Sequence, residues 1–305
     1  NLTIDSSARI LQFFLARLPA AGAGASEQLF LHFEVIPDHL PERLRALLVQ
    51  FPPGALQLEI GVQSFNPAVQ QTISRRQDNP ATEANLRWLL AHSHAHLHVD
   101  LIFGLPGETL ASFADGFDRL LAIGPHEIQL GLLKRLRGAP IARHTQAHAM
   151  RYAAEPPYTV LQTDVVDAAT VQGFARFARY WDLLANSGRF GRTLALLLQA
   201  GDQASAFRNF WAFSDWLWQR QGATHRLTPE QLVDALFDYL GQSGRWPAEA
   251  VRQSLLADYL ASGARANPQA LQGCLPRREP SGSGAPAGAA SRQQRHQNAQ
   301  PHSSG

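Results

Sequence analysis

Polar side chains interrupt one apolar stretch of the chain in a pattern that could hold a ligand. In and just after the stretch 55–62, Glu59, Gly61 and Gln63 alternate with apolar residues, and the period of two in a β-strand would place all three on one face. Gly61 would leave room for a ligand beside the backbone, and Glu59 and Gln63 could form hydrogen bonds with it. A bulge with solvated neighbours explains the same residues equally well.

A second apolar stretch carries an acid and runs into glycines. His98, Asp100, Ile102 and Gly104 would share one face of the expected strand. An aspartate in this position could hold a ribose hydroxyl, as carboxylates do at other nucleotide sites. Gly104 and Gly107, in the sequence Gly-Leu-Pro-Gly, would let the backbone come close to such a ligand.

Two further charged residues are candidates on weaker grounds. Glu34 lies inside an apolar strand-like run, where a carboxylate is costly to bury without a donor. It is either a ligand-binding acid or an edge-strand residue that faces water. Arg75 follows a short helix-like segment, and cations are common near helix C-termini for dipole reasons alone.

Alternating histidines at 92, 94, 96 and 98 resemble a row of metal ligands on one strand face. However, we expect the strand to begin only near Leu97, so that 92–96 form an exposed loop and bind no metal. The sequence holds a single cysteine, Cys274, which we expect to be an unpaired thiol. The sequence therefore indicates no metal site in this chain.

The elements that must position these residues alternate between helix and strand up to about Ile141, which predicts βαβ units and a parallel sheet. After Pro156-Pro157 the pattern predicts helices throughout 160–262, and a polar Gly/Ser/Pro/Gln tail follows that we expect to be disordered. We therefore expect an α/β domain over 1–150, an all-α domain over 151–263 and a disordered tail over 264–305. The expected helices are 7–18, 41–48, 67–74, 82–91 and 109–121, and the expected strands are 29–36, 55–62, 97–103 and 127–133.

Composition narrows the possible partners. The formal net charge is +2 and 17% of residues are charged, which makes nucleic acid an improbable partner; RNA binding by the tail would rest on composition only. No apolar run is long enough to span a bilayer, and the first residues carry no basic segment of a signal peptide. We expect a cytoplasmic protein without a membrane partner. No P-loop, dinucleotide-binding glycine motif or nucleophile elbow is present.

Taken together, these motifs resemble the fourth and fifth strands of radical S-adenosylmethionine (SAM) enzymes, in particular the oxygen-independent coproporphyrinogen oxidase-like and cobalamin-binding branches. The segments that carry this resemblance are EIGVQSFN (59–66), Ser74-Arg75 and HVDLIFGLPGE (98–108). LGLLKRLRGAP (130–140) resembles the sixth strand and its exit loop. Pro156-Pro157-Tyr158, Tyr180-Trp181 and Asn186 to Phe190 are similar to a C-terminal helical domain of unknown function in radical SAM proteins with a B12-binding domain.

The resemblance implies a partial TIM-like (β/α)6 barrel, represented by its later strands only, that binds SAM. It implies that Glu34 lies near the methionyl part, that Gln63 and Arg75 hold SAM, and that Asp100 lies near the ribose. It also implies that Gly104 to Gly107 form a turn beside the adenine. Glu59 is expected to join this SAM-binding set.

The family binds a [4Fe–4S] cluster through three cysteines in a C-x-x-x-C-x-x-C loop, and this chain lacks that loop. We therefore expect an N-terminally truncated fragment, inactive alone, of a radical SAM enzyme. The cluster, and cobalamin where it is used, would bind only to the full-length protein, which would carry out radical chemistry such as methyl transfer. The sequence identifies neither catalytic residues nor a substrate. The alternative is a non-catalytic nucleotide-binding α/β module or a degenerate gene product.

Overall fold

The computed structural model describes every residue except 1–2, 19–28, 202–203, 265, 277–294 and 297–305. The chain divides into two compact units, Asn1–Val171 and Gln172–Gly305. We describe each unit by itself.

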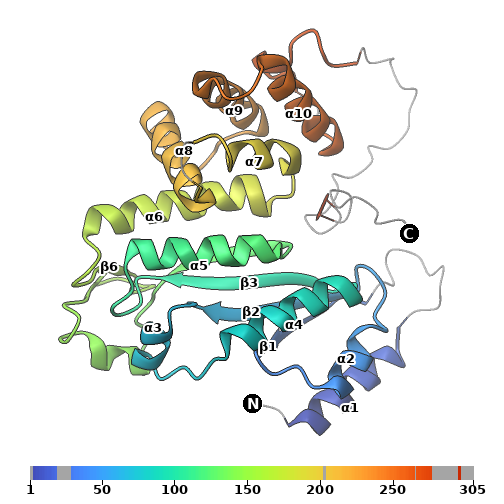
Figure 1. The fold of residues 1–305 in the computed structure, drawn as a ribbon, viewed down its shortest axis with the longest axis vertical. Coiled ribbons are helices and arrows are strands. Elements are labelled where there is room, and N and C mark those ends of the chain that lie inside the picture. The colour runs from blue at the N-terminus through green and yellow to red at the C-terminus, as the bar shows by residue number, and fades with distance from the viewer. Residues whose placement is uncertain (1–2, 19–28, 202–203, 265, 277–294, 297–305) are drawn as a thin grey trace. The chain divides into compact units, whose positions relative to one another are not determined.

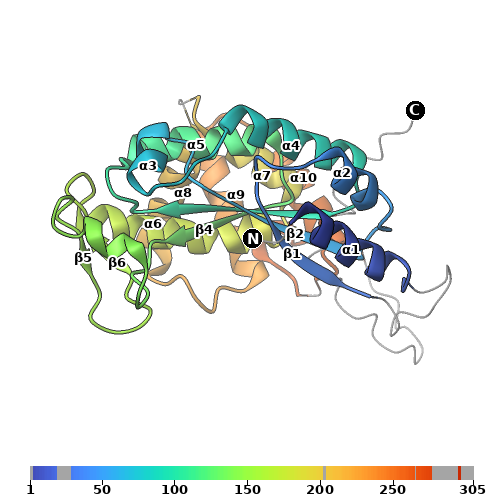
Figure 2. The same cartoon turned by 90° about the horizontal axis from the view of Figure 1, so that it is seen from below.

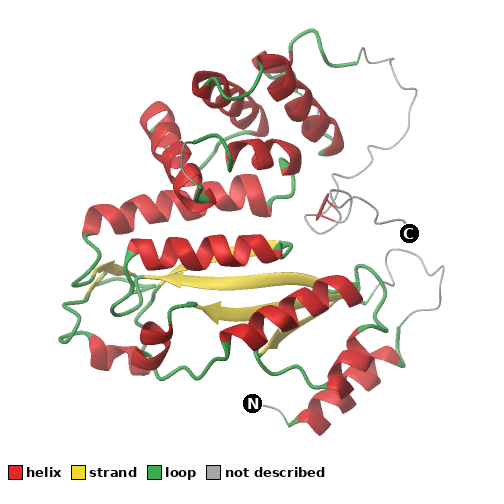
Figure 3. Ribbon diagram, viewed as in Figure 1, coloured by secondary structure: helices red, strands yellow, loops and turns green. Residues whose placement is uncertain are grey.

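The first unit contains a four-stranded parallel sheet (Figures 1 and 3). Its strands pair in the order in which they occur along the chain, which confirms the expected α/β fold with a parallel sheet. Successive parallel strands in this order are typical of a stretch of (β/α) barrel rather than of a doubly wound sheet. The strands are β1 (Leu31–Val35), β2 (Leu56–Gln63), β3 (His96–Phe103) and β4 (Glu127–Leu132).

The helices that connect the strands lie on one side of this sheet (Figure 2). Residues on that side of the strands, such as Leu58 and Val99, are fully buried. The alternate residues of β2 and β3 are only half-buried, so that the second face of the sheet carries the polar side chains. The connecting helices are α2 (Glu42–Leu48), α3 (Pro67–Thr72), α4 (Asn79–His92) and α5 (Leu110–Ile123), and α1 (Ile4–Leu15) packs against α2.

Local sequence signals explain where the connecting helices begin and end. The Asp78 side chain accepts a hydrogen bond from the Ala81 N–H at the start of α4, and Thr109 does the same for Ser112 at the start of α5. Gly124 ends α5 in the left-handed conformation that favours glycine. The sequence therefore places these helices within a few residues of their observed ends.

An antiparallel hairpin follows the sheet, and it corrects one expectation. The segment from Val160 was predicted to be helical, but β5 (Arg151–Tyr152) pairs with β6 (Val160–Gln162). The Val160 N–H donates to the Leu133 carbonyl oxygen at 2.8 Å, so that the hairpin is bound to the end of β4. The bond between Val160 and Leu133 joins residues far apart in the sequence, and local periodicity cannot predict such a contact.

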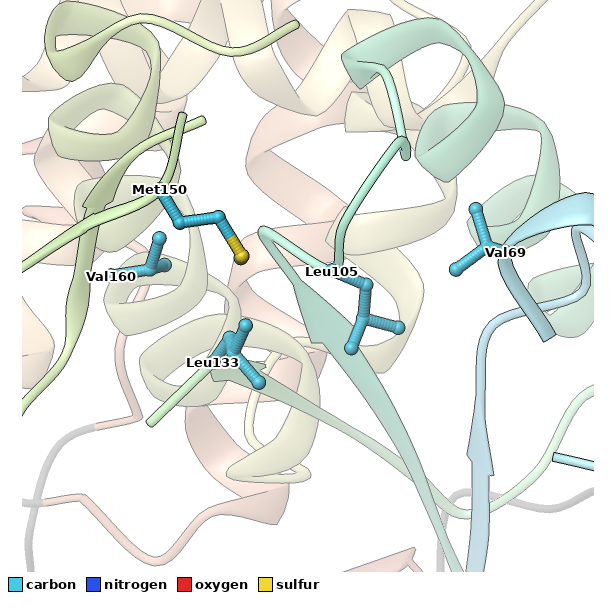
Figure 4. Close-up of a cluster of buried hydrophobic side chains, with 5 residues drawn as sticks. All are labelled: Val69, Leu105, Leu133, Met150 and Val160. Carbon is cyan, nitrogen blue, oxygen red and sulfur yellow. The ribbon is translucent and has the colours of Figure 1, made fainter. Parts of the chain in front are cut away.

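A cluster of buried side chains connects the hairpin to the exits of the strands (Figure 4). It unites α3, the turn after β3, the end of β4 and the hairpin, and its members are Val69, Leu105, Leu133, Met150 and Val160. Because all five are nearly inaccessible to solvent, the cluster fixes the loops at this end of the sheet relative to one another.

The second unit is helical, as expected. Its core is aromatic: Phe174, Phe177, Phe207, Phe210 and Phe213 are all buried. Its elements are α6 (Ala168–Trp181), whose first turn belongs to the first unit, a π-helix (Asp182–Asn186), α7 (Gly191–Leu197), α8 (Ala206–Gln221), α9 (Pro229–Ser243), α10 (Ala248–Ala261) and a short 3-10 helix (Gln269–Leu271). No helix in the described parts of the chain combines the length and apolarity needed to cross a membrane.

The predicted tail over 264–305 falls largely outside the described residues. Within the described segment 266–276, Leu271 belongs to the short 3-10 helix and is fully buried. Cys274 is exposed and unpaired, as expected.

Candidate functional site

A cavity of about 520 Å³ lies along the polar face of β1, β2 and β3. Its volume is in the range of small-molecule sites. Five of the seven predicted site residues line it: Glu34, Glu59, Gln63, Arg75 and Asp100. The structure therefore brings together residues that span 67 positions of the chain, from 34 to 100.

Strand register explains this convergence. Glu34 of β1 is the Cα partner of Glu59 of β2, and Gly61 of β2 is the partner of Asp100 of β3. Parallel pairing without a slip keeps alternate residues of neighbouring strands on one face. Glu34 lines the cavity and is also exposed to solvent, and its role as a ligand-binding acid stays a prediction.

The end of β2 contains a bulge that directs Gln63 toward the cavity. The register with β3 shifts between Gly61 and Gln63, and Gln63 has a φ of 69°. A Cβ atom added at Gly61 would lie 2.6 Å from the Gln63 side-chain nitrogen. The space at Gly61 is thus filled by Gln63 itself. The Gln63 Oε1 atom is buried and accepts no hydrogen bond within the described part of the protein.

Arg75 lies in the loop after α3, and its side chain contacts this bulge. Its guanidinium donates to the Gly61 carbonyl oxygen and, through Nε, to Gln77 Oε1 at 2.8 Å. Burial lowers the pKa of Arg75 and the nearby charge of Asp38 raises it, but an arginine stays protonated at any physiological pH. α3 ends at Thr72, three residues before Arg75. The position of Arg75 is therefore explained by its hydrogen bond to the bulge and not by the dipole of the helix.

Asp100 lines the cavity, and the pKa of its carboxyl group is raised. Burial is the largest of the causes that raise the pKa of Asp100 to about 7, and the charges of Glu59 and Glu34 and a hydrogen bond with Glu59 are the others. Its Oδ1 atom is buried without a hydrogen-bond partner among the described residues. Glu59 in turn lies 2.9 Å from Nε2 of His32. Asp100 thus changes its charge near neutral pH.

The cavity is acidic overall. Four carboxyl groups and two guanidinium groups line it: Glu34, Asp38, Glu59, Asp100, Arg75 and Arg76. An excess of carboxylates favours a ligand with positive charge. The arginines at one side would suit a carboxylate on the same ligand.

The sequence prediction overlooked a buried pair behind the cavity. The Ser64 hydroxyl donates to Glu108 Oε1 at 2.5 Å, and Glu108 is only 1% exposed. Burial raises the pKa of Glu108, hydrogen bonds from Ser64 and Ser112 offset part of this rise, and the resulting pKa is about 7. The pair connects the loop after β2 to the loop after β3. Ser64 lies in the motif 59–66 and Glu108 in the motif 98–108. Their place in these motifs is the only sign in the sequence that they have a role.

Side-chain amides order the same loop from the other side. Gln70 Nε2 donates to the Ser64 carbonyl oxygen and to Asn79 Oδ1, both at 2.8 Å. Asn79 Nδ2 donates to the Phe65 carbonyl oxygen at 2.8 Å. These amides satisfy backbone oxygens that no strand neighbour reaches, so that the loop beside Gln63 has one defined conformation.

The remaining two predicted residues do not line the cavity. Gly104 has a φ of 87°, and a Cβ atom there would lie 2.6 Å from Val160 Cγ1. Gly107 has a φ of 79° and lies next to His148. The structure explains both glycines by left-handed backbone and by close packing at Val160. A contact of this turn with adenine stays a prediction.

The row of histidines does not form. His92 is in the last turn of α4 and stacks on Trp88 with 5.1 Å between ring centroids. His96 was expected in an exposed loop, which is wrong: it begins β3, is buried, and its Nε2 lies 3.0 Å from Glu127 Oε1. Among the described residues, no cluster of three or more His, Cys, Asp or Glu side chains could hold a metal ion.

Comparison with known proteins gives one family and several relatives. The model of a family described as protein of unknown function (DUF4080) matches residues 146–300. The oxygen-independent coproporphyrinogen III oxidase of Cereibacter sphaeroides is 29% identical over 159 residues, which cover 49% of this chain and 34% of that enzyme. The enzyme of the same name from Thermostichus vulcanus is 30% identical over 146 residues, covering 45% of this chain and 44% of the enzyme.

The chain thus spans less than half the length of these curated relatives. These relatives support the resemblance to the radical SAM superfamily that the sequence motifs indicate. Among solved structures, the coproporphyrinogen III oxidase of Escherichia coli, described as a radical SAM enzyme, covers 86% of this chain and 66% of its own length at 17% identity. The TM-score of this match is 0.43.

Proposed function

Because this chain belongs to the family described as protein of unknown function (DUF4080), we propose a function from the cavity and the relatives together. The first unit binds SAM in the cavity of β1 to β3, as part of a radical SAM enzyme. The single observation that carries this proposal is the convergence of Glu34, Glu59, Gln63, Arg75 and Asp100 on one cavity.

The residues present suit SAM. Gln63 Oε1 and Asp100 Oδ1 are buried oxygens without hydrogen-bond partners in the described structure, and a buried acceptor without a donor costs about 1–3 kcal/mol. The ribose hydroxyls and the amino group of SAM would supply donors. The carboxylates would balance its sulfonium charge, and the arginines would attract its carboxylate.

In a radical SAM enzyme, bound SAM supplies the radical for chemistry on the substrate after reduction by an iron–sulfur cluster. The role of this chain would be to bind and orient SAM. Gln63, held by the bulge, would accept a hydrogen bond from the ligand. Asp100 would ionise as the cation enters.

The cluster itself does not fit these residues. It needs cysteine thiolates, and the sequence contains one cysteine. The cluster ligands would have to come from outside these 305 residues. The cobalamin-binding type and methyl transfer follow from the sequence resemblance alone and have no assigned residues. The cysteine count favours one second candidate, a non-catalytic α/β module that binds the nucleotide.

Calorimetric titration of the chain with SAM tests the proposal. S-Adenosylhomocysteine is the control ligand, because it keeps the nucleoside and the amino acid but lacks the sulfonium charge. We expect saturable binding of SAM and weaker binding of the homocysteine analogue, since the cavity is acidic. Absence of SAM binding would contradict the proposal.

A further inference from the structure

One segment of the first unit is strongly basic. Between Glu127 and Glu155 the sequence holds no aspartate or glutamate. It holds five lysines and arginines in the same interval: Lys134, Arg135, Arg137, Arg143 and Arg151. Basic and acidic residues are nearly equal in number over the whole chain, 27 against 25, so that this segment carries a local excess of positive charge.

The segment lines most of a second hollow, of about 320 Å³, after the end of β4. Its lining consists of Arg135, Leu136, Arg137, Gly138, Ala142 and Tyr158. No carboxylate is among these residues. Arg135 and Arg137 thus both contribute to the lining of a small hollow that is open to solvent.

The backbone of this cavity is fixed where residues 134–135 meet residues 158–159. The Arg135 N–H donates to the Tyr158 carbonyl oxygen at 3.0 Å, and Lys134 forms a β-bridge with Thr159. Just beyond, Leu133 and Val160 belong to the buried cluster of Figure 4. A pre-organised site loses less conformational entropy when a ligand binds.

Tyr158 adds a local sign of function. Its φ is 56°, a left-handed conformation that is costly for a residue with a bulky side chain. Such backbone outliers concentrate at ligand sites, where the surrounding structure holds them. Here the residue lines the cavity itself.

The two arginines are available to a ligand. Neither Arg135 nor Arg137 forms an ion pair with any residue that the structure describes. The Arg135 guanidinium lies 5.1 Å from the ring centre of Tyr152, a contact that orients it. By contrast, Arg143 of the same segment donates to Ser74 and His144. A planar guanidinium recognises carboxylate and phosphate oxygens through paired hydrogen bonds.

We propose that Arg135 and Arg137 form a binding site for a carboxylate or phosphate group of a small molecule. The loop after a parallel strand is where α/β enzymes bind their ligands. If the proposed function is right, this anionic group belongs to the substrate. That last identification alone rests on the proposed function. The volume of about 320 Å³ fits a small molecule.

Isothermal titration with two probes, citrate and pyrophosphate, tests the site in the absence of SAM. Citrate represents carboxylates and pyrophosphate represents phosphates. We expect saturable one-site binding of at least one probe, and about tenfold or greater weakening in the double variant Arg135→Gln/Arg137→Gln, as for hydrogen bonds between charged groups. The matched control is Arg151→Gln, which removes an exposed charge of the same segment that does not line the cavity. Its affinity should stay within about twofold.

Three results would overturn the inference. The first is no saturable binding of either probe to the wild-type chain. The second is equal weakening by Arg151→Gln, which would show general charge attraction. The third is much tighter, salt-sensitive binding of a single-stranded oligonucleotide that the double variant abolishes, which would indicate nucleic acid instead. The titration with citrate and pyrophosphate contains no SAM. A lack of anion binding would therefore contradict this inference alone, and a lack of SAM binding would contradict the proposed function alone.

Discussion

The Arg75 guanidinium donates a hydrogen bond to the backbone carbonyl oxygen of Gly61, fourteen residues earlier in the chain. This carbonyl lies at the point where β2 leaves its register with β3. Arg75 therefore satisfies an acceptor at the bulge and at the same time brings a positive charge to the wall of the acidic cavity. The bulge, Gln63 and Arg75 form one structural unit.

Gly61→Ala tests how this unit positions Gln63. The new Cβ would lie 2.6 Å from the Gln63 side-chain nitrogen, so the flexible amide must move away. We expect SAM to bind more weakly by about tenfold, the effect of losing one good hydrogen bond, with a change in unfolding free energy below about 1 kcal/mol because the obstacle is a side-chain end. Titration calorimetry measures the affinity for SAM, and urea unfolding measures the change in unfolding free energy. Unchanged affinity would show that Gln63 does not contact SAM.

The raised pKa of Asp100 predicts a pH dependence of binding. Asp100 holds its proton below about pH 7, and a cationic ligand stabilises the ionised form. SAM affinity should therefore increase between pH 6 and pH 7.5, and binding near pH 7 should release a proton.

Titration in two buffers of different ionisation enthalpy measures that proton release directly. Asp100→Asn should abolish the release and flatten the pH profile. Proton uptake, or an unchanged release in Asp100→Asn, would rule out this role of Asp100.

Glu108 predicts a contrast between two substitutions. Glu108→Gln keeps an acceptor for the Ser64 hydroxyl, whereas Glu108→Leu leaves that buried hydroxyl without its partner. We expect Glu108→Leu to lose about 1–3 kcal/mol of unfolding free energy and Glu108→Gln to lose much less. Chemical denaturation at pH 6 measures this difference.

The sign of the pH effect at Glu108 follows from its raised pKa. The folded state holds the proton more tightly than the unfolded state, whose glutamate has its ordinary pKa. Stability contributed by neutral Glu108 is complete at acidic pH and is lost as the pH rises through about 7. Glu108→Gln should lack this loss. Parallel pH profiles of the wild type and Glu108→Gln would contradict it.

The cysteine count predicts the outcome of cluster reconstitution. Incubation of the purified chain with iron and sulfide should give no stoichiometric [4Fe–4S] absorption, because a cluster needs several thiolates and the sequence holds one cysteine. Iron analysis and absorption spectroscopy provide the measurement, with Cys274→Ser as control. A full cluster on this chain would show that its ligands are other residues.

Strand periodicity was sufficient to predict most of the cavity. Glu59 and Gly61 share a face by the period of two, and Asp100 joins them because β2 and β3 pair in register as far as Gly61. Periodicity could not show that Gln63 fills the space at Gly61, since that depends on the bulge.

Other features depend on contacts between distant residues. Glu108 becomes buried only when the loops after β2 and β3 meet, and His96 is buried against Glu127 of the neighbouring strand. Val160 is a strand residue because Leu133 offers it a backbone partner. Local sequence patterns contain none of this information.

The most direct test of the central claim compares two matched glutamines in a SAM titration. Gln63 lines the cavity, whereas Gln129, on β4 opposite Asp100, does not. If SAM binds as proposed, Gln63→Ala should weaken binding by about tenfold and Gln129→Ala should leave it unchanged. Equal affinities of the two variants and the wild type would contradict the assignment of this cavity to SAM.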